Sequence, residues 1–178
     1  MFGDSLAAGY GVAPAGAWPQ LLQRKLQQEG YGATVVNASV SGETTSGGLA
    51  RLPRALQQHR PAVVLLELGA NDGLRGLPLP TVRSNLDKMI TLIQDAGAKV
   101  LLVGIQLPPN YGPAYSTRFR DLFTELARSR RVAVVPFLLE GVALEPRYMQ
   151  DDGLHPNAAA QPLLLATVWP HLQPLLAR

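Results

Sequence analysis

One stretch of the sequence restricts the possible folds more than any other: the run of residues 62–68, which lies between Pro61 and Gly69. It reads Ala-Val-Val-Leu-Leu-Glu-Leu, so it is almost continuously apolar and does not alternate with polar residues. A run of this kind is expected of a parallel strand that is covered by helices on both faces. The sequence therefore predicts a sheet buried between two layers of helices.

Three other apolar or β-branched runs repeat this pattern along the chain, at residues 34–36, 99–103 and 132–135. Segments with helical character separate them. An alternation of strands and helices is typical of α/β proteins with a parallel sheet. We therefore predict a doubly wound α/β fold in three layers.

Ordinary stop signals mark the helices between the strands. Helices are predicted at residues 18–29, ended by Gly30; at about 46–59; at 80–96, closed by Gly97; in a segment that runs to about residue 128; and from near Asn157 toward the end of the chain. Apolar residues with helical spacing of three and four predict the buried faces of the last three helices. These residues are Leu86, Met89, Ile90 and Ile93, then Leu122, Phe123 and Leu126, and then Leu163, Leu164, Val168 and Leu172.

The composition supports a single domain over residues 1–178, because 47% of the residues are hydrophobic and only 16% are charged. The net charge of +3 comes from scattered side chains, with the densest cluster at Arg128, Arg130 and Arg131. There is no basic stripe interleaved with aromatic residues, which indicates solvated helix faces and no nucleic-acid partner.

The chain has no cysteine, and this excludes disulfides, thiolate metal sites and a cysteine nucleophile. No apolar run has the length of a membrane span, and we expect neither a signal peptide nor an anchor in this form of the chain.

Two short blocks near opposite ends of the chain carry residues suited to acyl transfer. The first contains Ser5, and the second contains Asp152 and His155. A serine hydroxyl is a weak nucleophile that needs a base within hydrogen-bond reach and a third group to orient that base. A spacing of three residues on a turn can place the carboxylate of Asp152 beside one ring nitrogen of His155. The pattern therefore predicts a serine hydrolase with Ser5, His155 and Asp152 in these three roles.

Possible oxyanion donors follow the strands predicted at residues 34–36 and 62–68. Gly42 follows one strand and can offer its backbone N–H, and Asn71 follows the next and can offer its side-chain amide. The carboxyl ends of parallel strands lie at one edge of the sheet, so both residues are expected near Ser5. Taken singly, each is more typical of a turn. Taken together with the backbone N–H of Ser5, they indicate an oxyanion hole.

Other candidate sites are weaker. His59 precedes Arg60-Pro61, and His171 lies beside a proline in a terminal helical stretch, so surface or capping roles are favoured for both. The carboxylates of Asp4, Asp72, Asp151 and Asp152 have no second histidine beside them, and we expect no metal site.

The sequence around these residues resembles the GDSL esterases and lipases, also called SGNH hydrolases. The blocks that carry the resemblance are Gly3-Asp4-Ser5-Leu6, Gly42, Gly69-Ala70-Asn71-Asp72 and Asp152-Gly153-Leu154-His155. The segments at 37–39, 69–76, 107–112 and 149–153 resemble the bacterial thioesterase I and arylesterase branch. The likeness covers essentially the whole chain.

The resemblance implies a flavodoxin-like three-layer fold with strand order 2-1-3-4-5, which brings the ends of the first and third strands to the ligand-binding edge. It also implies Ser5 as nucleophile, His155 as base and Asp152 as its partner, with an oxyanion hole made of the Ser5 and Gly42 N–H groups and the Asn71 amide. For the compartment, it suggests the periplasm or secretion.

The first strand departs from the family pattern. Members carry an apolar strand of several residues before Gly-Asp-Ser, whereas here only Met1 and Phe2 precede it. Loss of a central strand would leave backbone groups unpaired and a gap in the core. Two hypotheses follow: the natural protein starts upstream, or the strand survives in a shortened form that lowers stability.

We expect a monomeric esterase that acts on small-molecule esters and acyl thioesters through an acyl-enzyme and needs no cofactor. Candidate residues for contact with the acyl chain are Leu74, Leu77, Leu107, Pro108 and Tyr111, from loops at the same edge. Their loops, at 73–80 and 107–113, could be a movable lid and a stiff wall, or plain connections. Two alternatives remain open: a carbohydrate O-acetylesterase on the same scaffold, and a non-catalytic flavodoxin-like binding module.

Overall fold

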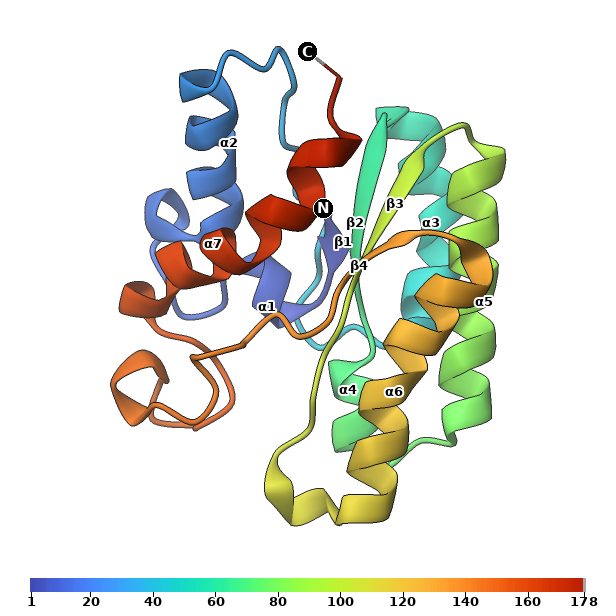
Figure 1. The fold of residues 1–178 in the computed structure, drawn as a ribbon, viewed down its shortest axis with the longest axis vertical. Helices are drawn as coiled ribbons and strands as arrows, with labels where there is room; N and C mark the ends of the chain where they lie inside the picture. The colour runs from blue at the N-terminus through green and yellow to red at the C-terminus, as the bar shows by residue number, and fades with distance from the viewer. Residues whose placement is uncertain (178) are drawn as a thin grey trace.

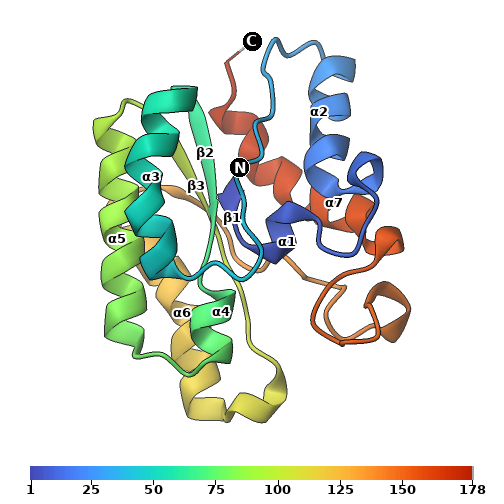
Figure 2. The ribbon, with the colours of Figure 1, turned by 180° about the vertical axis from the view of Figure 1, so that it is seen from behind.

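A parallel sheet of four strands forms the centre of the protein, which a computed structural model describes over residues 1–177. The strands are β1 (Phe2–Gly3), β2 (Val63–Glu67), β3 (Lys99–Val103) and β4 (Ala133–Val135), and they pair in that order. Phe2 lies opposite Leu66, Leu66 opposite Leu102, and Leu102 opposite Val134. Helices cover both faces of this sheet (Figures 1 and 2), which confirms the predicted three-layer α/β fold.

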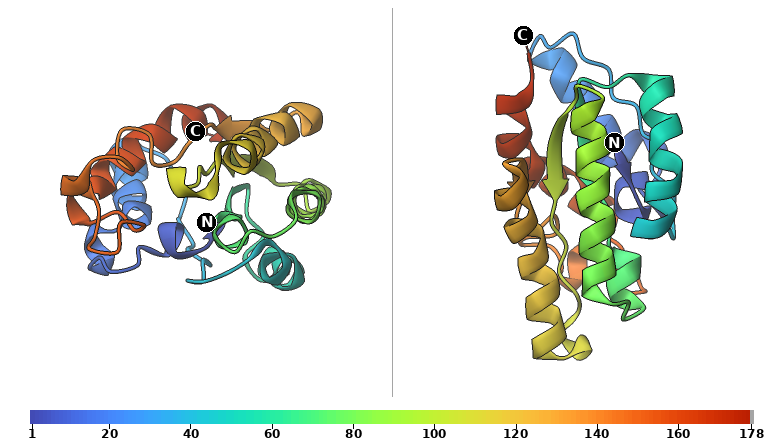
Figure 3. Two further views of the ribbon diagram at one scale, coloured as in Figure 1. Left: turned by 90° about the horizontal axis from the view of Figure 1, so that it is seen from below. Right: turned by 90° about the vertical axis from the view of Figure 1, so that its right-hand side faces the viewer.

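The two helical layers use opposite faces of the same strands. Leu66 and Leu102 point into a core built with α3 (Thr45–His59), α5 (Leu79–Asp95) and α6 (Pro113–Arg130). Leu65 and Leu101 point the other way, into a core built with α2 (Trp18–Gln28) and α7 (Gln161–Leu172). Since side chains alternate along a strand, a continuous apolar run serves both layers at once. The end-on view in Figure 3 shows the two groups of helices on either side of the sheet.

The predicted helices are present, and their boundaries differ from the expected ones by a few residues at most. Two short helices, α1 (Ser5–Ala8) and α4 (Ala70–Leu74), directly follow β1 and β2. The side chain of Asn157 caps a 3₁₀ turn that precedes α7 by accepting hydrogen bonds from Ala159 and Ala160. One predicted core residue of α7 is wrong: Leu163 is exposed, because the buried face of this helix consists of Gln161, Leu164, Val168 and Leu172. Among the described residues, no helix is both long and apolar enough to cross a bilayer.

The strand predicted at residues 34–36 is not formed. Residues 36–40 nevertheless run beside β1. Met1 N donates to Val36 O, Ala38 N donates to Met1 O, and Val40 N donates to Gly3 O. It occupies the outer place that the order 2-1-3-4-5 assigns to a second strand. With β1 only two residues long, residues 34 and 35 have no strand beside them, and an isolated extended segment does not form a ladder.

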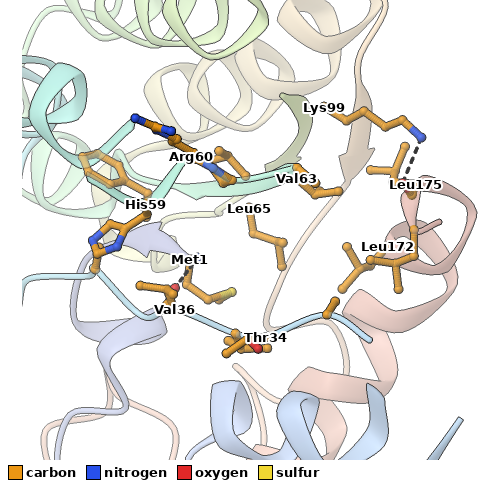
Figure 4. A pocket seen from close by; sticks show the side chains of 18 of the residues that line it. Met1, Thr34, Val36, His59, Arg60, Val63, Leu65, Lys99, Leu172 and Leu175 are labelled. Carbon is orange, nitrogen blue, oxygen red and sulfur yellow. Dashed lines mark hydrogen bonds between the residues drawn. The ribbon is translucent and has the colours of Figure 1, made fainter. Parts of the chain in front are cut away.

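A cavity of about 620 Å³ lies beyond the amino end of β1, and its lining is mostly apolar. Figure 4 shows Met1, Thr34 and Val36 around it together with Val63 and Leu65 of β2, and Leu172 also lines it. In the register of β1 with β2, residues placed before Met1 would lie opposite Val64 and Val63. The cavity therefore has the position of an extension of β1 between residues 34–36 and β2.

Five apolar residues added before Met1 are expected to raise the melting temperature by several degrees. Each apolar side chain buried there contributes about 1.5–3 kcal/mol, offset by about 1–2 kcal/mol of backbone ordering. At this chain length, 1 kcal/mol corresponds to about 2–4 °C. Thermal melting of both chains measures the effect, with a five-residue Gly-Ser extension as the control. Equal midpoints for the apolar extension and the parent chain would show that the cavity takes no strand.

Candidate active site

Three turns meet at the carboxyl edge of the sheet and bring the predicted site residues together. Ser5 follows β1 as the first residue of α1, and Asn71 lies in α4, directly after β2. Asp152 and His155 come from the loop between β4 and α7, which passes close to α1 (Figures 1 and 2). The short connections after β1 and β2 position Ser5 and Asn71 at this edge, and the long connection after β4 brings Asp152 and His155 back to it.

Ser5, His155 and Asp152 form a continuous hydrogen-bonded chain. His155 Nε2 lies 2.8 Å from Ser5 Oγ, and His155 Nδ1 lies 2.6 Å from Asp152 Oδ2. The ring is half-buried, and its side chain is 22% exposed. This arrangement requires the tautomer in which Nδ1 carries the proton, so that Nε2 can accept the proton of Ser5.

Local turn geometry holds Asp152 in its ionised form. Its Oδ1 accepts hydrogen bonds from the backbone N–H groups of His155 at 3.0 Å and Leu154 at 2.9 Å. These bonds, the one from His155 N–H first, lower the pKa of Asp152 to about 2. The carboxylate beside Nδ1 thus orients the His155 ring with Nε2 toward Ser5 Oγ.

Two of the three predicted oxyanion donors are free, and the third is occupied. Within residues 1–177, the backbone N–H groups of Ser5 and Gly42 donate to no protein acceptor. The Asn71 amide instead donates to Glu43 O at 2.9 Å and to Asp4 Oδ2 at 3.2 Å. An incoming oxyanion would have to compete with the longer of these bonds, the one to Asp4.

Gly42 is required at its position because of its backbone conformation. Its φ of +81° is unfavourable for residues with a Cβ, although a Cβ there would meet nothing within 4 Å. Gly42 is exposed, and its backbone conformation, not lack of space, is what favours glycine here. Arg75 Nη2 donates to Gly42 O at 3.4 Å from the far side of the turn.

Three residues at the site were not predicted from the sequence. The ring of Tyr10 packs against the ring of His155 with centroids 4.6 Å apart. Gln150 Nε2 donates to Tyr10 O at 2.8 Å and to Pro156 O at 3.0 Å, which links the serine turn to the histidine turn. Glu67 lies buried at the end of β2, against the serine turn. Only Glu67 has a visible signal, since it is the single ionisable residue in the apolar run 62–68.

The candidate acyl-chain residues lie on two neighbouring loops. Tyr111 OH donates to Leu74 O at 3.1 Å, and a Cβ on Gly73 would meet the Leu107 side chain at 2.6 Å. Leu77 packs against the core that contains α5 and α6. Of the five predicted residues, Leu107 alone lines the small cavity of about 270 Å³ next to α6. The structure thus joins Leu74 to Tyr111 across the two segments.

The remaining polar candidates lie apart from the serine or are engaged in structural contacts. His59 lines the cavity beyond β1, and His171 belongs to the last turn of α7. Asp72 is buried and bonds to the N–H of Thr45 at 2.9 Å and to its hydroxyl at 2.6 Å, at the start of α3. Among the residues described, no three His, Cys, Asp or Glu side chains form a group that could hold a metal ion.

Comparison with known proteins gives relatives over nearly the whole chain. An arylesterase of Vibrio mimicus is 52% identical over 162 residues, which are 91% of this chain and 81% of that protein. Thioesterase 1/protease 1/lysophospholipase L1 of Escherichia coli K12 is 46% identical over 176 residues, which are 99% of this chain and 83% of that protein.

Solved structures agree with these relatives. The crystal structure of TesA matches with a TM-score of 0.96 at 51% identity, over 98% of this chain and 97% of that one. The psychrotrophic esterase EstA from Pseudoalteromonas sp., in a structure inhibited by monoethylphosphonate, matches with a TM-score of 0.92 at 40% identity, over 97% and 94% of the two chains. These likenesses confirm the fold expected from the motifs. A model of the GDSL-like lipase/acylhydrolase family matches residues 1–162, and the chain belongs to this family.

Proposed function

We propose that this protein is a serine esterase that hydrolyses carboxylic esters and acyl thioesters, with Ser5 as nucleophile, His155 as base and Asp152 as its orienting partner. The observation that carries the proposal is the continuous contact from Asp152 to His155 to Ser5, at 2.6 Å and 2.8 Å. Relatives named arylesterase and thioesterase support the two substrate classes.

The proposed reaction has two half-reactions. His155 Nε2 takes the proton of Ser5 while Oγ attacks the carbonyl carbon, and the protonated ring then gives the proton to the departing alcohol or thiol. Ionised Asp152 stabilises the imidazolium during this step. Water then attacks the acyl-enzyme with His155 again as base, and the carboxylic acid leaves. The residues present supply every proton transfer.

The negative charge that develops on the carbonyl oxygen would lie beside the Ser5 and Gly42 N–H groups. Within residues 1–177 both groups have no protein acceptor, so neither has to break a protein hydrogen bond in order to donate to the oxyanion. The Asn71 amide would add a third donor by releasing Asp4. A well-aimed donor of this kind contributes about 3 kcal/mol to the transition state.

We place the acyl chain along Leu74, Leu77, Leu107, Pro108 and Tyr111. The link from Tyr111 OH to Leu74 O supports this assignment, because it holds the loop after β3 against α4, next to Asn71.

We also propose that the chain acts as one domain and as a monomer, without a nucleic-acid partner. Light scattering coupled to gel filtration tests the oligomeric state.

Intact-mass analysis after treatment with a fluorophosphonate tests the nucleophile. A single adduct is expected, located on Ser5 by peptide mapping, together with turnover of p-nitrophenyl acetate, butyrate and octanoate and of an acyl-CoA. The ratios of kcat/KM among these substrates rank acyl length and leaving group. A folded protein with no adduct and no turnover would contradict the proposal and favour a binding module.

Replacing Gln150 with alanine is expected to lower kcat about tenfold, because the link between the serine turn and the histidine turn is lost and small misplacements are costly in acyl transfer. The KM should change little, since Gln150 makes its contacts with the protein backbone. Gln27→Ala, an exposed glutamine of α2, is the matched control. Equal kcat values for the two variants would show that the link does not matter.

A further inference from the structure

Glu67 holds the serine turn from both sides. Its Oε2 accepts hydrogen bonds from Asp4 N at 3.3 Å and from Ala7 N at 3.2 Å, and these residues precede and follow Ser5. Glu67 and Asp4 are both completely buried. Burial of an ionisable side chain costs free energy unless hydrogen bonds or paired charges compensate for the lost hydration.

The backbone leaves room for this carboxyl group. A Cβ on Gly3 would lie 2.6 Å from Glu67 Oε2 and 2.7 Å from Glu67 O, so only glycine fits between β1 and the Glu67 side chain. Gly3 therefore allows the Glu67 side chain to pack against the serine turn. The strand pairing that places Gly3 opposite Glu67 fixes the same contact.

Asp4 connects Glu67 to the oxyanion side of the site. Asp4 Oδ1 accepts a hydrogen bond from Leu6 N at 3.0 Å, and Asp4 Oδ2 accepts one from the Asn71 amide at 3.2 Å. The orientation of Asp4 thus bears on both the first turn of α1 and the side chain of Asn71.

The surroundings of the two carboxyl groups raise the pKa of both. Burial raises the pKa of Glu67 well above its usual range, and the charge of Asp4 and a hydrogen bond to Asp4 raise it further. Burial also raises the pKa of Asp4, to about 6, although its hydrogen bonds with Leu6 and Glu67 oppose this. Within residues 1–177, Glu67 Oε1 has no hydrogen-bond partner of either kind, so no donor there stabilises a negative charge on this oxygen.

The charged groups around the pair are few. Asp72 from α4 raises the pKa of Asp4, and His155 from the C-terminal loop lowers it. Arg51 from α3 donates to Gly3 O at 3.5 Å. Burial thus shifts both carboxyl groups toward their neutral forms, and the charge of Asp4 favours the proton on Glu67.

We propose that Glu67 is a positioning residue of the acyl-transfer site, which in its neutral form holds Asp4 and Ala7 and through them Ser5 and Asn71. This inference rests on the proposed serine-esterase function and adds a role for a side chain that takes no part in the triad. Glu67 does not contact the substrate, so its removal acts on kcat more than on KM.

Two substitutions separate hydrogen bonding from charge. Glu67→Gln keeps a neutral side chain with an acceptor for the two N–H groups, and kcat at pH 7 is expected within about threefold of the parent. Glu67→Leu keeps a neutral, buried side chain of similar size without hydrogen bonds, and kcat is expected to fall at least about tenfold with KM little changed. Val100→Ala, near the amino end of the neighbouring strand β3 and away from the site, controls for general weakening of the sheet and should keep the parent kcat.

The pH dependence of stability tests the protonation state without any need for activity. The folded protein keeps a proton on Glu67 that the unfolded chain releases above a pH of about 4.3, so its stability falls as pH rises from there toward the raised pKa. The Glu67→Gln variant has no proton to release at this position, so its stability does not fall with pH for this reason. Its melting temperature minus that of the parent is therefore expected to increase from pH 5 to pH 9, while the contribution of Asp4 is common to both proteins.

Each failure has a distinct meaning. A melting-temperature difference that does not change with pH would overturn the neutral Glu67. A Glu67→Leu variant with the parent kcat, or a Glu67→Gln variant as impaired as Glu67→Leu, would overturn the positioning role. A parent protein without turnover would instead contradict the serine-esterase proposal, and the stability measurement would still report the proton on Glu67.

Discussion

Ser5→Ala is expected to lower kcat by at least about 10⁴-fold, and His155→Ala by a similar factor, with the folded structure kept in both cases. Ser5 Oγ supplies the bond to the acyl carbon and His155 Nε2 supplies its base, so neither step has a substitute at the site. Because the two residues act as one unit, the double variant should be only slightly slower than either single variant. Steady-state kinetics with p-nitrophenyl butyrate measure all three.

Matched controls lie elsewhere in the chain. Ser129→Ala removes a hydroxyl that donates only to Leu126 O near the end of α6, and His171→Ala removes a histidine in α7. Both controls should keep the parent kcat. Factors that multiply in the Ser5/His155 double variant would show that the two side chains act independently, which would contradict the proposed nucleophile–base pair.

The second large effect is expected for Asn71→Ala, with a loss of about 10²-fold or more in kcat and little change in KM. An oxyanion donor acts on the charge that develops in the transition state, so its removal leaves substrate binding almost unchanged. The size of the loss also reports the competition between the oxyanion and Asp4 for the amide hydrogen. A loss well below 10²-fold would mean that the amide stays bound to Asp4 during the reaction.

Asn85→Ala is the control for this substitution. Asn85 is buried, and like Asn71 its amide makes two hydrogen bonds: it donates to Thr45 Oγ1 and Ser46 Oγ at 3.1 Å, at the start of α3. This variant should lose stability and retain kcat. Parent-like turnover in Asn71→Ala would exclude Asn71 from the oxyanion hole and leave the Ser5 and Gly42 N–H groups as its donors.

Much of the architecture follows from local sequence patterns. The apolar run at 62–68 and the three-four spacing of Leu86, Met89, Ile90 and Ile93 report which faces are buried, because side-chain periods of 2 and 3.6 are properties of the backbone itself. The contact between Asp152 and His155 belongs to the same class, since three residues on one turn place the two groups together. These features needed no knowledge of the rest of the molecule.

Other features depend on partners that are distant in the sequence. Residues 34–36 have strand-like composition, yet a strand also needs a neighbour of sufficient length, and β1 is only two residues long. The hydrogen-bond partners of Asn71 come from Asp4 and Glu43, which lie 67 and 28 residues away. Local patterns carry no information about such contacts.

The sequence by itself thus determined the α/β class, the faces of the helices and the residue types of the site. Only the tertiary structure gave the contact distance between the predicted pair Ser5 and His155. It alone decided that the Ser5 and Gly42 N–H groups have no protein acceptor within residues 1–177 while the Asn71 amide is engaged, and that Glu67 lies buried against Asp4. The physical reason is that hydrogen-bond satisfaction and the pKa of a buried group depend on the atoms packed around it, and packing brings those atoms from segments far apart in the chain.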